Sequence, residues 1–173
     1  MNNLETEAKI EVDYEIIQKV SEIIGKPRWN IQRNYIYKFD GGILRIRYEN
    51  GRSFLTAKGK GLDCEYNKRP EIECEIPAGF FKAFSKLRTF LGNPFYYEKS
   101  RASASHRNCT VCLDNLEGRY FIEIEGIEED IKVSIGELGL RSYPIEKRSY
   151  LEILMEEKRA DEKKLWKVMW AWR

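Results

Sequence analysis

Glutamate and basic residues recur at every second position in several short segments of the chain. Glu5, Glu7 and Lys9 have this spacing near the first residue, and Glu123 and Glu125 repeat the carboxylate pair much later. Clustered carboxylates hold hard divalent cations such as Mg²⁺ or Mn²⁺ through oxygen, whereas clustered arginines and lysines bind phosphate oxygens. Both groups together serve metal-assisted phosphoryl transfer. The pattern therefore predicts a site for a divalent metal ion and a ligand with several phosphates.

A period of two places such residues on one face of a β-strand, because successive side chains point to opposite faces. In residues 4–12 the second face is apolar, which indicates a strand with one charged and one buried side. Like charges stand next to each other along these rows, whereas exposed sheets usually mix signs. Other rows are expected on further strands: Arg45 and Arg47, Lys58, Arg69 with Glu71 and Glu73, and Lys99 with Arg101.

Most of the elements that must carry these rows are expected to be strands joined by tight turns. Asp40-Gly41-Gly42 and Glu49-Asn50-Gly51 are hairpin signals. This order predicts one α+β domain over residues 1–173, with an antiparallel sheet or barrel and flanking helices. Strands are expected near 4–13, 30–39, 43–48, 53–58, 67–76, 95–106, 108–114, 118–126 and 144–154, and helices over 14–25, 77–92, 128–139 and 156–173.

If helices cover the outside of a closed sheet, the charged rows line its interior. Charges in such an interior are costly unless they pair or meet a ligand. We therefore expect the acidic and basic rows to form one polar site.

Composition limits the remaining classes of function. The chain has 30 basic and 28 acidic residues and a net charge of only +2, so no global field favours nucleic acid or an anionic membrane as a partner. No apolar run is long enough to span a bilayer, and residues 1–5 lack the start of a secretory signal. These features predict a cytoplasmic protein with reduced thiols.

The four cysteines could in principle form a four-thiolate zinc site, since two of them have the C-x-x-C spacing. However, nine residues separate Cys64 from Cys74, and Cys112 lies in an apolar strand segment with Cys109 just before it. We therefore expect neither a metal nor a redox role for them. His106 is the only histidine, which excludes a multi-histidine metal site.

Glu5-x-Glu7-x-Lys9 resembles the E-x-E-x-K signature of the CYTH superfamily, the triphosphate tunnel metalloenzymes. This group includes class IV adenylyl cyclases, thiamine triphosphatases and tripolyphosphatases. Further segments resemble family motifs in the family's order across residues 4–154. These are Leu44-Arg45-Ile46-Arg47, Thr56-Ala57-Lys58-Gly59, Arg69-x-Glu71-x-Glu73, Lys99-x-Arg101, Asp114 with Gly118, Glu123-x-Glu125, and Arg148-Ser149-Tyr150-Leu151-Glu152-Ile153-Leu154.

The resemblance implies an antiparallel eight-stranded β-barrel that forms a tunnel around a triphosphate and Mg²⁺ or Mn²⁺. Glu71 and Glu73 would orient the basic groups. The implied metal ligands are Glu5, Glu7, Glu123 and Glu125, with Asp114 as a further acidic candidate. The implied phosphate-binding residues are Lys9, Arg45, Arg47, Lys58, Arg69, Lys99 and Arg101, with Arg148 and Tyr150 as additional candidates. Of these, Glu5, Glu7, Lys9, Glu123 and Glu125 would form the catalytic set.

The sequence leaves the reaction open. We expect metal-dependent hydrolysis of a triphosphate such as ATP, thiamine triphosphate or tripolyphosphate. Cyclisation of ATP to cyclic AMP and pyrophosphate is the alternative, and a non-catalytic polyphosphate or nucleotide binder is a third. Asn34 stands where family members often have Asp, and small residues follow Arg101 where cyclase-like members have Tyr. A homodimer is compatible with the prediction, and the tryptophan-rich helix over 156–173 is expected to pack as core or cap.

Overall fold

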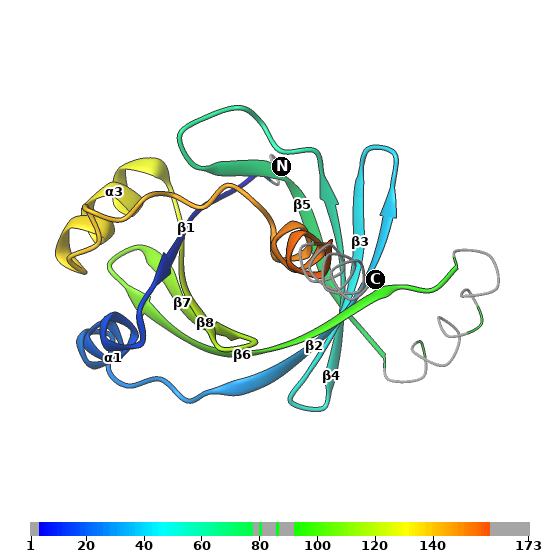
Figure 1. The fold of residues 1–173 in the computed structure, drawn as a ribbon, viewed down its shortest axis with the longest axis horizontal. Coiled ribbons are helices and arrows are strands. Elements are labelled where there is room, and N and C mark those ends of the chain that lie inside the picture. The colour runs from blue at the N-terminus through cyan, green and yellow to red at the C-terminus, as the bar shows by residue number, and fades with distance from the viewer. Residues whose placement is uncertain (1–3, 78–79, 81–85, 87–91, 160–173) are drawn as a thin grey trace, which may run out of the picture.

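Eight antiparallel strands form a closed ring in the computed structural model, which describes residues 4–77, 80, 86 and 92–159 (Figure 1). Their order around the ring is β1-β5-β4-β3-β2-β6-β7-β8, and β8 closes it by pairing with β1. The predicted α+β fold with an eight-stranded antiparallel barrel is confirmed. The strands are β1 (Leu4–Val12), β2 (Asn30–Phe39), β3 (Gly42–Glu49), β4 (Arg52–Gly59), β5 (Asn67–Ile76), β6 (Phe95–His106), β7 (Cys109–Leu116) and β8 (Arg119–Glu125).

The predicted hairpin turns connect neighbouring strands of this ring. Between β3 and β4, Asn50 and Gly51 have φ angles of 51° and 77°, as the favoured two-residue hairpin turn requires. At the other end of the same pair, a Cβ atom on Gly42 would lie 2.1 Å from the carbonyl oxygen of Lys58. Glycine is therefore needed where β3 and β4 come closest.

The main apolar core lies outside the ring, between its wall and the helices α1 (Tyr14–Ile23) and α3 (Glu128–Glu137) (Figure 1). Ile17 and Val20 of α1 and Ile131 of α3 are buried in it, against wall residues such as Ile10 and Ile122. The apolar faces of β1 and β8 thus point outward, which turns their charged faces inward. Within the described part of the chain, no helix is long and apolar enough to cross a membrane.

A second apolar cluster closes one end of the ring. It contains Tyr150, Leu151, Ile153 and Leu154 from a helix over residues 150–159, which we call the plug helix. In Figure 1 this helix, in orange, lies over the opening of the ring. These side chains pack against Ile36, Tyr97, Leu116 and Phe121 of the wall. The interior is therefore apolar at this end.

The predicted strand over 144–154 is wrong, because residues 150–159 are helical and only Ile145 forms an isolated bridge, with Ile10. The helix begins with a capping box. The Ser149 hydroxyl accepts a hydrogen bond from the Glu152 amide at 3.3 Å, and the Glu152 carboxylate accepts one from the Ser149 amide at 2.7 Å. The apolar residues that suggested a strand instead form one face of this helix.

Two predicted helices lie largely outside the described residues. Of the helix over 77–92, residues 78–79, 81–85 and 87–91 are not described, and Phe80 and Lys86 are helical. Of the helix over 156–173, residues 160–173 are not described. The helices expected over 14–25 and 128–139 are confirmed as α1 and α3.

Replacing Ile122 by Ala should lower the free energy of unfolding by about 3 kcal/mol, because it leaves a cavity in fully buried packing. Urea unfolding followed by circular dichroism measures the change. Ile72→Ala on β5 is the matched control, since Ile72 is 61% exposed and should cost less than about 0.5 kcal/mol. Equal losses for both variants would contradict the described core.

Candidate active site

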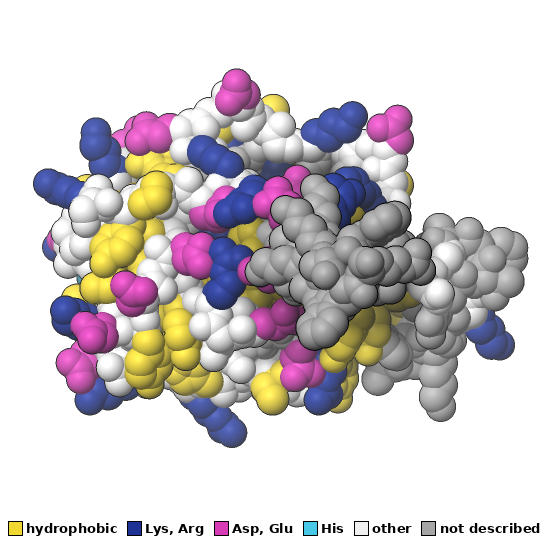
Figure 2. Space-filling view, in the orientation of Figure 1, with side chains coloured by type: hydrophobic (Ala, Val, Ile, Leu, Met, Phe, Trp, Pro, Cys, Tyr) yellow, Lys and Arg dark blue, Asp and Glu magenta, His cyan; other side chains and the backbone are white. Residues whose placement is uncertain are grey.

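A cavity of about 600 Å³ occupies the interior of the ring, and all eight strands contribute to its lining. In the space-filling view, basic and acidic side chains lie side by side near the centre of the face shown (Figure 2). The structure thus brings together residues that are far apart in the sequence. The predicted site residues that line the cavity are Glu5, Glu7, Lys9, Arg45, Arg47, Lys58, Arg69, Lys99, Arg101, Glu123 and Glu125.

Strand register explains how β1 brings these rows together. On one side, Glu7 lies opposite Glu125 of β8, and Lys9 lies opposite Glu123. On the other side, Glu5 lies opposite Arg69 of β5. Opposed residues in an antiparallel pair share a face, so all six point into the same interior.

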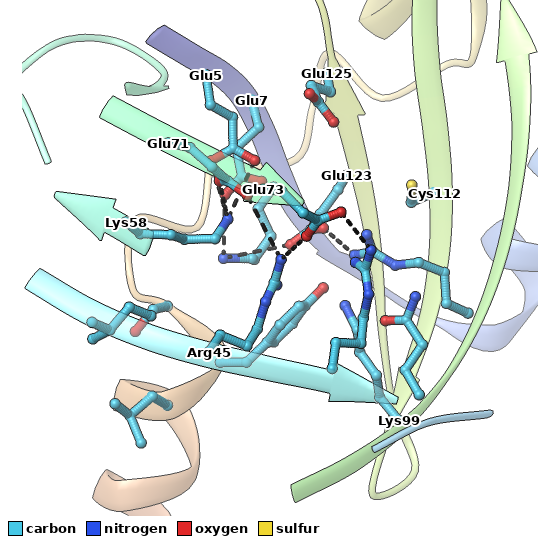
Figure 3. A pocket seen from close by; sticks show the side chains of 18 of the residues that line it. Glu5, Glu7, Arg45, Lys58, Glu71, Glu73, Lys99, Cys112, Glu123 and Glu125 are labelled. Carbon is cyan, nitrogen blue, oxygen red and sulfur yellow. Dashed lines mark hydrogen bonds and ion pairs between the residues drawn. The ribbon is translucent and has the colours of Figure 1, made fainter. Parts of the chain in front are cut away.

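Glu5 and Glu7 share a small number of basic partners at one part of the cavity (Figure 3). Glu5 Oε2 lies 3.2 Å from both Lys58 Nζ and Arg69 Nε. Glu7 Oε1 lies 3.4 Å from Arg69 Nη2 and 3.8 Å from Lys9 Nζ. Arg69 thus serves both carboxylates at once, which leaves this region acidic. Glu125, opposite Glu7 in the register, adds an exposed carboxylate at the mouth.

The pKa values of these three carboxyl groups are all raised. Burial is the main cause for Glu5, followed by a hydrogen bond with Glu71. For Glu7, burial acts together with the nearby charge of Glu123. For Glu125, whose carboxylate is only partly buried by the cavity wall, this partial burial acts with the charges of Glu5 and Glu7. A raised carboxyl pKa means that the ionised form is disfavoured, so the positive charge of the basic neighbours does not fully compensate for the burial of these carboxylates.

A divalent cation would supply that charge. Mg²⁺ binds through one or two carboxylates and retains several waters, so the oxygen donors of Glu5, Glu7 and Glu125 fit it chemically. No group of three or more His, Cys, Asp or Glu side chains within the described residues is already arranged as a metal site. The three carboxylates would therefore have to converge around an ion.

Asp114 has a different position from these three carboxylates. It is fully buried, does not line the cavity, and accepts hydrogen bonds from Lys99 Nζ at 2.8 Å, Arg101 Nε at 2.7 Å and Tyr150 Oη at 2.6 Å. Burial alone would raise the pKa of Asp114, but the charges of Arg101 and Lys99 outweigh it and lower the pKa. Its oxygens are thus already occupied by donors, so Asp114 orients basic groups.

Glu123 lines the cavity but is also neutralised by basic residues. It pairs with Arg101, and its Oε1 lies 3.8 Å from Lys9 Nζ. Although burial opposes ionisation, Arg101, Lys99 and Lys9 hold the pKa of Glu123 well below its ordinary value. The structure therefore divides the predicted metal ligands into two groups. The basic neighbours of Glu5, Glu7 and Glu125 leave their pKa values raised, whereas those of Glu123 and Asp114 lower the pKa values of these two carboxyl groups.

Tyr150 at the start of the plug helix joins the site to the closed end of the ring. Lys9 Nζ and Lys99 Nζ lie 4.6 Å and 4.3 Å from the centroid of its ring, within range of cation–π attraction. Lys9 Nζ also donates a hydrogen bond to the Arg148 carbonyl oxygen at 3.0 Å. The segment that begins the plug helix therefore fixes two of the predicted phosphate-binding lysines.

The basic residues of β3 and β4 are held by β5. Arg45 Nη2 lies 3.1 Å and Arg47 Nη2 lies 2.8 Å from the carboxylate of Glu73. Lys58 pairs with Glu71, its register partner on β5. These two glutamates thus contact the basic groups that the resemblance assigned to them.

Besides Asp114, Arg148 and Glu11 of the predicted motifs and rows also lie away from the cavity. The Arg148 side chain is exposed and does not line the cavity; its Nη1 lies 2.7 Å from Glu156. Glu11 continues the row of Glu5 and Glu7, but its carboxylate pairs with Arg119 near the plug helix. The spacing of these residues in the sequence could not show which of them line the cavity and which lie beyond its end.

Several lining residues were not predicted, among them Gln32, Glu49, Ser103 and Cys112. Gln32 and Asn34 lie two residues apart on β2 and therefore share one face of it. This pair of amide side chains was the sequence signal for a polar inward face on β2. The thiols form no metal site: Cys64 and Cys74 are exposed, and all four cysteines are free.

Solved structures resemble this fold closely. A conserved hypothetical protein from Pyrococcus furiosus has a TM-score of 0.72 and 26% identity, covering 86% of this chain and 98% of its own. The PH1819 protein from Pyrococcus horikoshii OT3 has a TM-score of 0.70 and 32% identity, covering 88% and 99%. This chain belongs to the same family as PH1819, and its fold is of the CYTH type.

A more distant structure with this CYTH-type fold is HpAC1 from Hippeastrum, a candidate adenylyl cyclase described as having a dominant triphosphatase activity. It has a TM-score of 0.67 and 17% identity, covering 88% of this chain and 96% of its own, a likeness that shows the fold alone. No protein-family model matches the sequence, and a comparison with curated proteins gives no match.

Stability should depend on pH through Lys99. Burial, and then the charge of Arg101, lower the pKa of Lys99 from 10.5 to about 8. Between pH 8 and 9 the unfolded chain therefore binds more protons than the folded one, so the free energy of unfolding rises with pH, by about 1 kcal/mol. Lys99→Met should remove this rise, which urea unfolding at both pH values measures. The same rise in the variant would exclude Lys99 as its source.

Neutralising Glu7 should stabilise the metal-free protein. The raised pKa of Glu7 means that its ionised form opposes folding at pH 7.5, and Glu7→Gln removes that charge without changing its shape. Differential scanning calorimetry should show a higher melting temperature without metal and a smaller increase on adding Mn²⁺. For wild type, Mn²⁺ at a hundred times its Kd should add about 2.7 kcal/mol.

Glu75→Gln is the control for this measurement, because Glu75 is exposed on β5 and pairs with Arg52. It should leave the effect of Mn²⁺ unchanged. A Glu7→Gln protein that melts at a lower temperature and keeps the full Mn²⁺ effect would contradict the acidic region described above.

Proposed function

We propose that this protein is a divalent-metal-dependent enzyme that hydrolyses a triphosphate bound inside the ring. One observation carries the proposal: the same cavity holds carboxylates and basic side chains whose charges are not fully neutralised by each other. The buried carboxylates of Glu5 and Glu7, with Glu125 beside them, are not fully compensated by their basic neighbours, as their raised pKa values indicate. Elsewhere in the same cavity, basic side chains are short of negative charge. A metal ion together with a polyphosphate satisfies both.

The shortage of negative charge is clearest at Arg47. Burial lowers the pKa of Arg47, and the neighbouring charges of Arg45 and Arg101 lower it further, against the opposing effects of Glu73 and Glu49. Arg47 is thus less well compensated than Arg101, whose pKa is raised well above its usual range by Asp114 and Glu123. Guanidinium groups bind phosphate oxygens through paired hydrogen bonds, so a chain of phosphates fits between them.

The remaining basic residues extend this surface towards the acidic region. Lys58 pairs with Glu5, and Arg69 pairs with both Glu5 and Glu7. Lys9 lies between Glu7 and Glu123. Phosphates held here would lie beside Glu5 and Glu7. Such an arrangement positions the phosphorus atoms and neutralises charge that develops during transfer.

Glu5, Glu7 and Glu125 would hold the metal ion. When bound, Mg²⁺ or Mn²⁺ would stabilise negative charge on the phosphoryl oxygens as a Lewis acid. A carboxylate beside the ion would orient the attacking water towards phosphorus.

Turnover measurements distinguish hydrolysis from the alternatives. The protein is incubated with ATP, thiamine triphosphate or tripolyphosphate and Mg²⁺ or Mn²⁺, and orthophosphate, pyrophosphate and cyclic AMP are measured separately. We expect orthophosphate, released only with metal and not in excess EDTA. Cyclic AMP with pyrophosphate would identify a cyclase instead, and tight binding without turnover would identify a binding protein.

Glu5→Gln should lower kcat/KM at least 100-fold, because it removes a metal-binding carboxylate that also pairs with Lys58 and Arg69. Glu11→Gln is the matched control, since Glu11 lies on the same strand but pairs with Arg119 away from the cavity. It should change kcat/KM less than threefold. Similar losses in both variants would show that the β1 carboxylates act only through folding.

A further inference from the structure

A fully buried hydroxyl group lies in the basic wall of the cavity and has no part in the function proposed above. It belongs to Thr56, in the middle of β4. Thr56 lies opposite Arg45 of β3 and opposite Glu73 of β5, so three neighbouring strands each contribute one residue to an inward-facing row. Arg45 and Glu73 line the cavity, whereas Thr56 does not.

The small side chain of Thr56 lets Arg45 reach across β4. Neighbouring strands lie about 4.8 Å apart, so an arginine on β3 can reach a carboxylate on β5 only by lying over the strand between them. Arg45 takes this course, and its Nη2 lies 3.1 Å from Glu73 Oε2 (Figure 3). A large side chain in the middle of the row would obstruct it.

The next row along the same strands has such a side chain. Phe54 holds its middle position, between Arg47 of β3 and Glu75 of β5. The Arg47 guanidinium packs over the Phe54 ring, 4.9 Å from its centroid, and Glu75 pairs with Arg52. The middle residue therefore decides whether an arginine on β3 reaches the carboxylate of its own row, and Thr56 permits it.

The Thr56 hydroxyl makes hydrogen bonds in both directions. It donates to Glu73 Oε2 at 2.7 Å and accepts from Arg45 Nε at 3.3 Å and Arg45 Nη2 at 3.2 Å. These directions are fixed, because an ionised carboxylate only accepts and a guanidinium only donates. One edge of the Arg45 guanidinium is thus held. Within the described residues no hydrogen bond engages its Nη1, so that atom is left for a ligand.

The same hydroxyl keeps the Glu73 carboxyl group ionised. Burial alone would raise the pKa of Glu73, but the hydrogen bond from Thr56 is the largest of several effects that together lower it. An ionised Glu73 is also the charged partner of Arg45. Loss of the hydroxyl would therefore loosen Arg45 twice, through the missing hydrogen bonds and through a weaker carboxylate anchor.

We propose that Thr56 is a positioning residue for the polyphosphate, because its hydroxyl holds the Arg45 guanidinium with Nη1 free to meet phosphate oxygens. This inference rests on the proposed triphosphatase function and adds to it a residue that does not touch the ligand. A mobile arginine must be ordered when phosphate binds, which lowers affinity, whereas a guanidinium that is already fixed avoids this loss.

Two replacements separate the hydroxyl from the rest of the side chain. Thr56→Val keeps the shape of threonine without the hydroxyl, and Thr56→Ser keeps the hydroxyl without the methyl group. In isothermal titration calorimetry with EDTA, Thr56→Val should bind tripolyphosphate about tenfold more weakly, the size of one hydrogen bond to a charged group. Thr56→Ser should stay within threefold of wild type. In turnover with Mg²⁺, Thr56→Val should raise KM about tenfold and change kcat less than threefold.

A double-mutant cycle tests whether Thr56 acts through Arg45. In an Arg45→Met background the group to be positioned is absent, so Thr56→Val should change tripolyphosphate binding less than threefold. A full tenfold effect in this background would overturn the inference. Thr56→Ala removes the same hydroxyl and takes the place of Thr56→Val in every comparison if that variant does not fold.

Thr6→Val is the matched control. Thr6 is also buried in the ring wall, but it lies on the face of β1 that turns towards the apolar core, so tripolyphosphate binding should be unchanged. Thr56→Val should keep the full stabilisation by Mn²⁺, because the acidic region lies on β1 and β8. Loss of that stabilisation would show a structural role for Thr56 and overturn the inference.

The outcomes separate this inference from the proposed function. Wild-type binding by Thr56→Val, or an equal loss in Thr56→Ser, would overturn the inference while triphosphate turnover by wild type keeps the function. Binding of tripolyphosphate that depends on the Thr56 hydroxyl, without turnover of any triphosphate, would support the inference and refute the function. A wild type that neither binds tripolyphosphate nor turns over any triphosphate would refute both.

Discussion

Charges that line a closed ring of strands must be neutralised with little help from bulk water, and this constraint governs the rest of the structure. β1 satisfies it from both sides, since it pairs with β5 and β8. Arg69 from β5 contacts Glu5 and Glu7, and Glu123 from β8 contacts Lys9. A shift of β1 by one residue would turn its charges into the apolar core under α1 and α3, so register is strongly determined.

Some charged side chains inside the ring are well paired and others are not. The poorly paired ones make the cavity suitable for a charged ligand. Around Asp114, donors from Lys99, Arg101 and Tyr150 occupy the carboxylate completely enough to lower its pKa despite full burial. Around Glu7 and Arg47 the balance fails in opposite directions. A protein selected only for stability would pair these groups with each other. Keeping them apart lowers the stability of the empty protein and favours binding.

Period-two patterns were sufficient to predict the strands and which residues share a face, because both follow from local backbone geometry. They could not distinguish Glu125 from Glu11, since each continues a row of glutamates but only Glu125 lines the cavity. Nor could they show that Asp114 is saturated by donors from β6 and the plug helix. Such facts depend on which strands become neighbours. The strand predicted over 144–154 was avoidable, because Ser149 and Glu152 have the spacing of a capping box.

The plug helix gives the cavity a direction. Tyr150 is packed against Phe121 and Tyr97 at the apolar end, while its ring lies near the ammonium groups of Lys9 and Lys99. Along β8, Phe121 lies in this apolar cluster, Glu123 follows inside the cavity, and Glu125 is exposed at the mouth. The polarity of the lining therefore increases away from the plug helix. A charged ligand would enter past Glu125, and the lysines fixed by Tyr150 would mark how far its phosphates can reach.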